Sequence, residues 1–328
     1  MYDEDKIRFV NECYPGSEDS RKWVLSSLKI LSDYERRWGF DFTEQEYELL
    51  QDAFNKVTVI TYNGTKTTLI RFRKYAKWRI ANDLPCSDAV FRLEADRTIA
   101  MRESMVPSPS YLSKVLDATF DDPVIGSIDI IYRVFLWMGF SGLNDVEAIK
   151  VTDDELDFSS MVIRHSEKTY TIYNEAKYDF RIACDLREFS ENKKSRKRVD
   201  GHEIMRGKEN KRTQPLEVIL VKTIRPTLTR KLEAAELKNQ KSTPPLDLGF
   251  DLTFNRIYMS GFFYRLYQQE LNGCPPDFAQ YAQDEFERAE RSDKPYKVSQ
   301  ANPKPAILLR IRKSTESDYN NWKRAFSL

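Results

Sequence analysis

The sequence lacks any close pair of cysteines. Its four cysteines, Cys13, Cys86, Cys184 and Cys274, lie far apart, whereas zinc sites and redox motifs use cysteines only a few residues from one another. We therefore expect reduced thiols, no metal and no cofactor.

Long apolar runs are also missing. No stretch approaches the roughly 18 consecutive apolar residues of a membrane span, and the opening MYDEDKIRF is too charged for a signal peptide. We expect a cytoplasmic protein with no membrane partner.

A strong overall charge is absent as well. The net charge of +1 gives no global attraction for a polyanion, so any nucleic-acid site requires local segregation of charge. With 41% hydrophobic and 31% charged residues the composition is that of a globular protein, and 328 residues favour two domains.

The first hundred residues have helical patterns. Residues 18–38 have apolar residues at helical spacing, and TEQEYELLQDAF begins with a capping box at Thr43. Residues 65–80 have two helical stripes: one is expected to pack against the domain core, and the other is basic, with Lys66, Arg73 and Lys77. The packing stripe is Leu69, Phe72, Ala76 and Ile80.

The segment VPSPS predicts the domain boundary. Its prolines remove backbone donors, and Ser108 or Ser110 is expected to cap the next helix. We expect a helical domain at 1–105, a linker at 106–110 and a second domain at 111–328.

The second domain has a mixed pattern. An apolar helix in IDIIYRVFLWMGFSGL is followed by VTDDELDFSSMVIRHSEKTYTIYN, which predicts two or three short antiparallel strands. Helical patterns return in residues 176–189, 215–240 and 252–271, and a terminal helix closes the chain. The predicted fold class is mainly α (α+β) with a small antiparallel sheet.

Residues 193–212 form a second basic segment, with nine basic and three acidic side chains. We expect a loop or ribbon there. If it follows a nucleic-acid backbone, binding is strongly salt dependent. A mobile charged loop without a ligand is the alternative.

The segment GFSGLNDVEAIKVTDDELDFSSMVI resembles the first conserved box of the tyrosine recombinases, or phage integrases. In that family a helix ends in a Gly-Leu-Arg turn, a Glu follows, and an Asp-hydrophobic pair leads into a β-hairpin. The residues that keep this frame are Gly142, Leu143, Glu147, Ala148, Leu156 and Asp157. The resemblance implies a two-domain architecture, with a helical DNA-clamping domain before an integrase-like domain.

The catalytic positions that the resemblance implies are degenerate. The first arginine falls on Asn144, and the His-x-x-Arg box places Met259 or Ser260 at the histidine and Phe262 or Phe263 at the arginine. Lys168 suits the hairpin lysine and Tyr319 the nucleophile. An amide offers neither the charge nor the bidentate fork of a guanidinium. We therefore expect no strand cleavage and no enzyme activity.

Binding of double-stranded DNA does not depend on the catalytic set, because dispersed cations make most phosphate contacts. Asn and Arg side chains are those that read adenine and guanine edges. The candidate DNA-binding residues are Lys66, Arg71, Arg73, Lys74, Lys77, Lys168, Arg206, Lys208, Lys211, Arg212, Asn255, Arg256 and Arg265. Phe254, Tyr258, Phe262 and Leu266 are expected in the core instead.

A recombinase scaffold without its catalytic set resembles the integrase-like master lysogeny repressors of SPβ-type phages. The resemblance implies a cytoplasmic, nucleoid-associated repressor in a bacterial host, which binds an operator and no small-molecule substrate. Two other functions stay open: a divergent recombinase in which Tyr319 attacks and Arg206 or Arg265 supplies charge, and a structural role without DNA. A homo-oligomer, a regulatory protein partner and the packing of the C-terminal helix also stay open.

Overall fold

The computed structural model describes residues 2–57, 62–120, 129–185, 188–190, 196–198, 204, 220–290 and 295–328. Over these residues the protein is mainly helical, with a small antiparallel sheet, which confirms the expected fold class. No helix in these ranges has both the length and the apolar character needed to cross a membrane. The chain divides into two compact units, Met1–Ala100 (the N-terminal unit) and Met101–Leu328 (the C-terminal unit).

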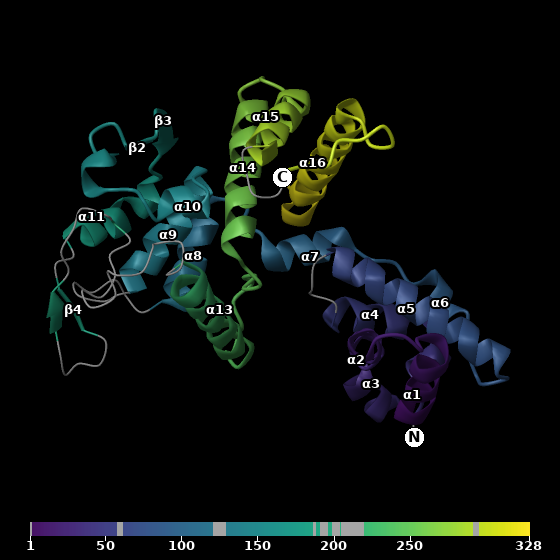
Figure 1. Cartoon of the computed structure of the whole chain (residues 1–328). Coiled ribbons are helices and arrows are strands. Elements are labelled where there is room, and N and C mark those ends of the chain that lie inside the picture. The colour runs from purple at the N-terminus through teal and green to yellow at the C-terminus, as the bar shows by residue number, and fades with distance from the viewer. Residues whose placement is uncertain are drawn as a thin grey trace. The chain divides into compact units, whose positions relative to one another are not determined.

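The N-terminal unit is built from helices around one apolar core (Figure 1). These helices are α1 (Tyr2–Cys13), α2 (Glu18–Leu28), α3 (Ser32–Trp38), α4 (Tyr47–Val57), α5 (Tyr62–Ala81) and α6 (Ala89–Arg92). Helix α7 (Arg97–Ser104) follows and contains the division between the units. Phe9, Leu28, Phe54 and Phe72 are fully buried in the core.

The capping box predicted at Thr43 is not formed. Thr43 lies in the 3-10 turn Phe42–Glu44, where the Asp41 carboxylate accepts the Thr43 backbone N–H at 3.0 Å. Helix α4 begins only at Tyr47. A helix follows the predicted cap, but it starts four residues later, and the Asp41 carboxylate caps the intervening turn.

The predicted packing stripe of α5 is correct except at its end. Leu69, Phe72 and Ala76 are buried, whereas Ile80 is exposed. The chain turns away three residues later, where Asp83 takes a positive φ, and Ile80 stays exposed at the helix end.

The C-terminal unit joins helices to a three-stranded sheet. Its helices are α8 (Pro109–Thr119), α9 (Asp129–Ser141), α10 (Asp145–Ala148), α11 (Lys177–Asp185), α13 (Arg225–Gln240), α14 (Phe254–Leu271), α15 (Phe278–Glu290) and α16 (Lys304–Phe326). A π-helical turn, Leu220–Ile224, leads into α13. Ser108 caps α8 as predicted, accepting the Tyr111 N–H at 3.2 Å. The linker predicted at 106–110 lies inside this unit, where Val106 is fully buried.

Helix α9 is the central element, because every one of its residues is buried. Its one arginine, Arg133, is neutralised by Asp179 at 2.9 Å and Asp117 at 2.7 Å. Trp137 Nε1 donates to the same Asp179 at 2.9 Å. A buried charge is tolerated only when paired in this way, so α11 is held against α9 by these bonds.

Helix α14 crosses α9 at very close range (Figure 1). A Cβ atom built on Gly261 would lie 1.8 Å from the carbonyl oxygen of Phe140, so only glycine fits there. Phe254 and Leu266 of α14 are buried, as predicted, while Tyr258 and Phe262 are half-buried against the cores. The C-terminal helix α16 packs in cis, with Trp322 buried against Phe263.

The predicted strands are present as β1 (Leu156–Asp157), β2 (Val162–His165) and β3 (Lys168–Thr171), paired antiparallel in that order. Ser166 and Glu167 both have positive φ, which matches the right-handed twist of a two-residue hairpin.

One helix expectation is wrong. The end of AKYDFRIACDLREF is not helical: α11 ends at Asp185, and Glu188–Ser190 is the strand β4. It pairs with β5 (Arg196–Arg198), so part of the basic segment forms a ribbon. The pairing partner lies outside the local pattern, and periodicity alone does not reveal it.

Candidate nucleic-acid interface

The turn after α9 holds the arginine of α14. Gly142 has φ of +111°, which strongly favours glycine, and its N–H bonds back to Met138 at 3.1 Å. Arg265 Nη1 donates to the carbonyl oxygen of Phe140 at 2.6 Å. A Cβ on Gly142 would lie 2.9 Å from Arg265 Nη2, so the guanidinium rests on the turn. A cation at a helix C-terminus also complements the helix dipole.

Aromatic side chains surround this guanidinium. Tyr173 is hydrogen-bonded to Arg265. The rings of Tyr173 and Tyr264 lie 5.9 Å apart and both contact Phe140. Burial is the main cause that raises the pKa of Tyr170, to about 12, with the carboxylate of Glu147 adding to it. The hydroxyl groups therefore stay protonated at neutral pH and can act as hydrogen-bond donors.

Asn144 is the N-cap of α10. Its Oδ1 accepts the Glu147 N–H at 2.9 Å, and the Glu147 carboxylate accepts the Asn144 N–H at 3.1 Å. An amide at this position can stabilise a turn or contact phosphate. The structure shows the cap, a role that a guanidinium does not fill.

Lys168 lies on the hairpin that borders the Gly142 turn. It is exposed and stands opposite His165 in the register, with Tyr170 opposite Ile163. Alternate residues share a face, so Lys168 projects on the same side as Tyr170. His165 Nδ1 contacts Glu155 at 2.8 Å. The structure thus brings Asn144, Arg265 and the strand of Lys168 to one region of the unit.

Three residues that the resemblance aligns with catalytic positions lie outside that region: Ser260, Phe263 and Tyr319. Ser260 is fully buried, where its Oγ accepts the Val106 N–H at 2.9 Å and donates to the Arg256 carbonyl at 2.7 Å. Phe263 packs against Trp322 and Tyr319. These positions belong to a core between α14 and α16.

Tyr319 is 2% exposed, and its hydroxyl donates to the carboxylate of Glu270. Lys323 binds the same carboxylate at 2.9 Å. Burial, followed by the negative charge of Glu270, raises the pKa of Tyr319. The phenol is therefore held neutral and away from solvent, which opposes a nucleophilic role.

Asn255 and Arg256 begin α14. Arg256 forms an ion pair with Asp251 at 2.5 Å and is half-buried. Asn255 is exposed at the rim of a cavity of about 500 Å³ whose rim also holds Asp145 and Arg225, which pair with one another. Of the two, Asn255 is the side chain that is more open to a partner.

The cations of α5 divide into two groups. Lys66, Lys74 and Lys77 are exposed. Arg71 contacts the hydroxyl of Ser27, and Arg73 Nη2 donates to the Leu93 carbonyl at 2.7 Å. Arg71 and Arg73 are thus engaged by their own unit, and the three lysines are exposed, with the Lys74 ammonium 5.8 Å from the centroid of the Tyr14 ring.

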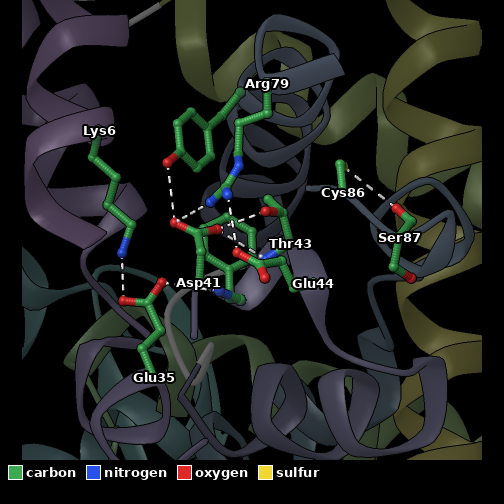
Figure 2. A network of polar contacts seen from close by, with 10 residues as sticks. Lys6, Glu35, Asp41, Thr43, Glu44, Arg79, Cys86 and Ser87 are labelled. Atoms are coloured by element: carbon green, nitrogen blue, oxygen red, sulfur yellow. Dashed lines mark hydrogen bonds and ion pairs between the residues drawn. The ribbon is translucent and has the colours of Figure 1, made fainter. Parts of the chain in front are cut away.

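Arg79, the sixth cation of α5, is buried. It forms ion pairs of 2.9 Å with Asp41 and with Glu44 (Figure 2). Tyr75 donates to the same Asp41 oxygen, Oδ2, at 3.0 Å, while Oδ1 accepts the Thr43 N–H. Arg79 therefore stabilises the unit and is unavailable to a ligand.

A second buried ion pair, between Lys6 and Glu35, lies beside this network (Figure 2). The other Glu35 oxygen accepts the Phe42 N–H at 3.0 Å. Neither network can be predicted from local sequence, because their members come from α1, α3, a turn and α5. A lysine on the face of α1 that also buries Phe9 and Val10 carries no local signal of its partner.

The remaining predicted residues, Arg206, Lys208, Lys211 and Arg212, lie outside the described residues. For the part of the chain that is described, no group of three or more His, Cys, Asp or Glu side chains is arranged to hold a metal ion. Comparison with models of known protein families and with curated proteins yields no match to this chain.

Proposed function

We propose that this chain is a non-enzymatic, sequence-specific double-stranded DNA-binding protein, and that it acts as a transcriptional repressor of a phage or prophage. The proposal combines the sequence resemblance to tyrosine recombinases with the positions of the cations and of the degenerate residues. The resemblance alone supports the repressor role and the lysogeny it maintains.

One observation carries the binding part of the proposal. Helix α5 has 20 residues and six cations but no acidic residue, and Lys66, Lys74 and Lys77 are exposed on it. Exposed charges on a helix are usually mixed in sign, which keeps the local potential low. A face of one sign attracts a polyanion and makes binding depend on counterion release.

The non-enzymatic part is supported by what occupies the degenerate positions. Asn144 caps a helix, Ser260 bonds a backbone N–H, and Tyr319 is buried on Glu270. Removing one positioned donor from a transition state costs about 10² to 10³ in rate. Loss of several such groups leaves no efficient route to strand cleavage.

The test uses the purified full-length chain and two probes, a random-sequence duplex and a duplex enriched from a random library. Fluorescence anisotropy is measured from 50 to 300 mM salt, a range chosen because counterion release acts there. We expect tighter binding of the enriched duplex and affinity that falls steeply with salt. The triple variant Lys66→Gln, Lys74→Gln, Lys77→Gln is expected to flatten the salt dependence.

The matched control neutralises two exposed lysines elsewhere, Lys238 and Lys241, and is expected to bind like the wild type. Equal affinity for both duplexes would remove the repressor function. Absence of salt-sensitive binding would instead favour a structural role. A covalent adduct on a nicked duplex, lost in Tyr319→Phe, would establish the divergent recombinase.

A further inference from the structure

Helix α5 carries an exposed apolar side chain within its row of lysines. Ile70 is 55% exposed and belongs to no part of the core of its unit. It is one helical turn from Lys66 and one from Lys74, and Lys77 lies one turn beyond. At 100° per residue these four side chains fall within about 80° around the helix axis. They form a single stripe, which we call the Ile70 stripe.

The stripe is rigid in its middle. Phe72, on the opposite side of α5, and Leu69, at the border of the stripe, are buried and fix the helix on its core. A β-branched side chain in a helix has one strongly preferred χ1 rotamer, so Ile70 loses little entropy when it meets a partner. Arg73, the nearest arginine, is held aside by the Leu93 carbonyl.

The charge around Ile70 selects the partner. An apolar surface of a partner protein would contact Ile70 but would offer no anions to the lysines on either side of it. A DNA duplex presents phosphates at both edges of a groove, where these lysines can bind them. From Lys66 to Lys77 the stripe spans about 16 Å, close to the roughly 12 Å width of the DNA major groove. Lysines at the ends can reach phosphates while the centre faces base edges.

Thymine supplies the apolar group that such a centre fits. In the major groove the C5-methyl of thymine is the hydrophobic feature, and aliphatic side chains contact it. Resting on the DNA-binding function proposed above, we propose that Ile70 is a specificity-determining residue that reads thymine methyl groups, with the lysines of the Ile70 stripe on the flanking phosphates.

The experiment replaces thymine by uracil, which removes the methyl group and keeps base pairing. The duplex enriched on the wild-type chain is compared with copies in which each thymine is changed singly to uracil. We expect at least one change to weaken wild-type binding about fourfold, the value of one buried methyl group. Ile70→Ala is expected to lose a similar factor on the thymine duplex and to be insensitive to that change.

Leu49→Ala is the control, because Leu49 is 54% exposed on α4 of the same unit. It is expected to keep the wild-type response. Random-sequence DNA is expected to bind Ile70→Ala and wild type equally, since phosphate contacts do not involve Ile70. Ile70→Val, which removes one carbon, is expected to lie between Ile70→Ala and wild type and guards against a folding defect.

Two failures are distinguishable. If wild type binds and selects DNA but no thymine-to-uracil change matters, or Ile70→Ala keeps the wild-type sensitivity, the role of Ile70 is overturned and the DNA-binding function stands. If wild type binds neither duplex, the DNA-binding function itself fails, and the role of Ile70 fails with it.

Discussion

The hydroxyl of Tyr319 donates a hydrogen bond to the carboxylate of Glu270, and the ring stacks on Trp322 at 6.1 Å. The tyrosine thus ties α16 to α14. The Lys323 ammonium also forms an ion pair with the Glu270 carboxylate at 2.9 Å, so this carboxylate binds a phenol hydroxyl and a cation.

Tyr319→Phe is expected to lower the free energy of unfolding by about 1 kcal/mol, because it removes one hydrogen bond but keeps the ring. Glu270 retains Lys323 and water contact, which keeps the cost at the low end. Urea unfolding of the full chain measures it. Neither protein is expected to form a covalent adduct with a nicked duplex, and an adduct in the wild type alone would contradict the inactive assignment.

Asn144→Ala is expected to destabilise the C-terminal unit by about 1 kcal/mol, since the cap of α10 is lost. Asn144→Asp keeps the oxygen acceptor and serves as the control. Asn144→Arg introduces the arginine that the resemblance to tyrosine recombinases implies, but it is expected to lose the cap without gaining cleavage, because Tyr319 stays buried. Thermal unfolding and a plasmid-nicking assay check both; nicking by Asn144→Arg would refute this expectation.

Lys77 and Arg79 are two residues apart on α5 and are expected to behave in opposite ways. Lys77→Ala leaves stability within about 0.5 kcal/mol, as for an exposed site, and lowers the salt slope of DNA binding by about 0.9. Arg79→Ala leaves the buried Asp41 without its cation and costs about 3 kcal/mol. Anisotropy measures the salt slope and urea unfolding the stability of each variant. Equal losses of stability, or equal losses of salt slope, in the two variants would contradict these separate roles of Lys77 and Arg79.

Lys6→Met is expected to destabilise the N-terminal unit by about 3 kcal/mol at pH 7, because Glu35 is left as an unpaired buried charge. Burial raises the pKa of Glu35 above its ordinary 4.5, although Lys6 opposes this. A raised pKa in the folded state means that the stability from this group is greatest below pH 4.5 and is lost as pH rises through the raised value.

The loss caused by Lys6→Met is therefore expected to shrink as pH falls toward 4.5, where Glu35 takes up a proton. The double variant Lys6→Met, Glu35→Gln is the control and is expected to recover most of the stability at pH 7. Urea unfolding at pH 7 and near pH 4.5 tests this. A loss that is the same at both pH values would show that packing of the lysine stem, and not charge, is responsible.

Asp157 anchors the turn between β1 and β2. Hydrogen bonds from Ser159 and Ser160, with Arg164 adding to them, lower the pKa of Asp157 below its ordinary 3.8. A lowered pKa means that the stabilising effect is fully present above pH 3.8 and is lost as pH falls through the lower folded value.

Asp157→Asn is thus expected to have a lower melting temperature than wild type at pH 7, with the difference narrowing at pH 3 and below. Asp247→Asn, at an exposed aspartate of the same unit, is the control and is expected to change little. Melting curves by circular dichroism across this range give the answer. A difference that widens with acidity would contradict the sign.

Local pattern predicted much of the fold. The buried helix α9, the cap at Ser108 and the Asp157 turn all follow from residues close in sequence, which act on one another directly. The positions that the resemblance to tyrosine recombinases aligns with catalytic residues could also be named from sequence. Their present roles, such as the cap at Asn144, required the geometry.

Distant partners are what the sequence could not supply. From sequence, Arg79 is one more cation of a basic helix. Its partner Asp41 lies 38 positions earlier, and the spacing of residues within a helix does not show which distant acid packs against it. The strand β4 was read as helix for the same reason, since its partner β5 is a separate segment. Local propensity ranks conformations of a segment, but burial and pairing decide between them.

The contact between Gly261 and the Phe140 carbonyl restricts how this scaffold can diverge. Even a methyl group at position 261 would lift α14 away from α9 and draw Arg265 off the carbonyl that holds it. The glycine, the arginine four residues later and the turn at Gly142 must therefore change together or not at all, whatever chemistry the surrounding positions gain or abandon.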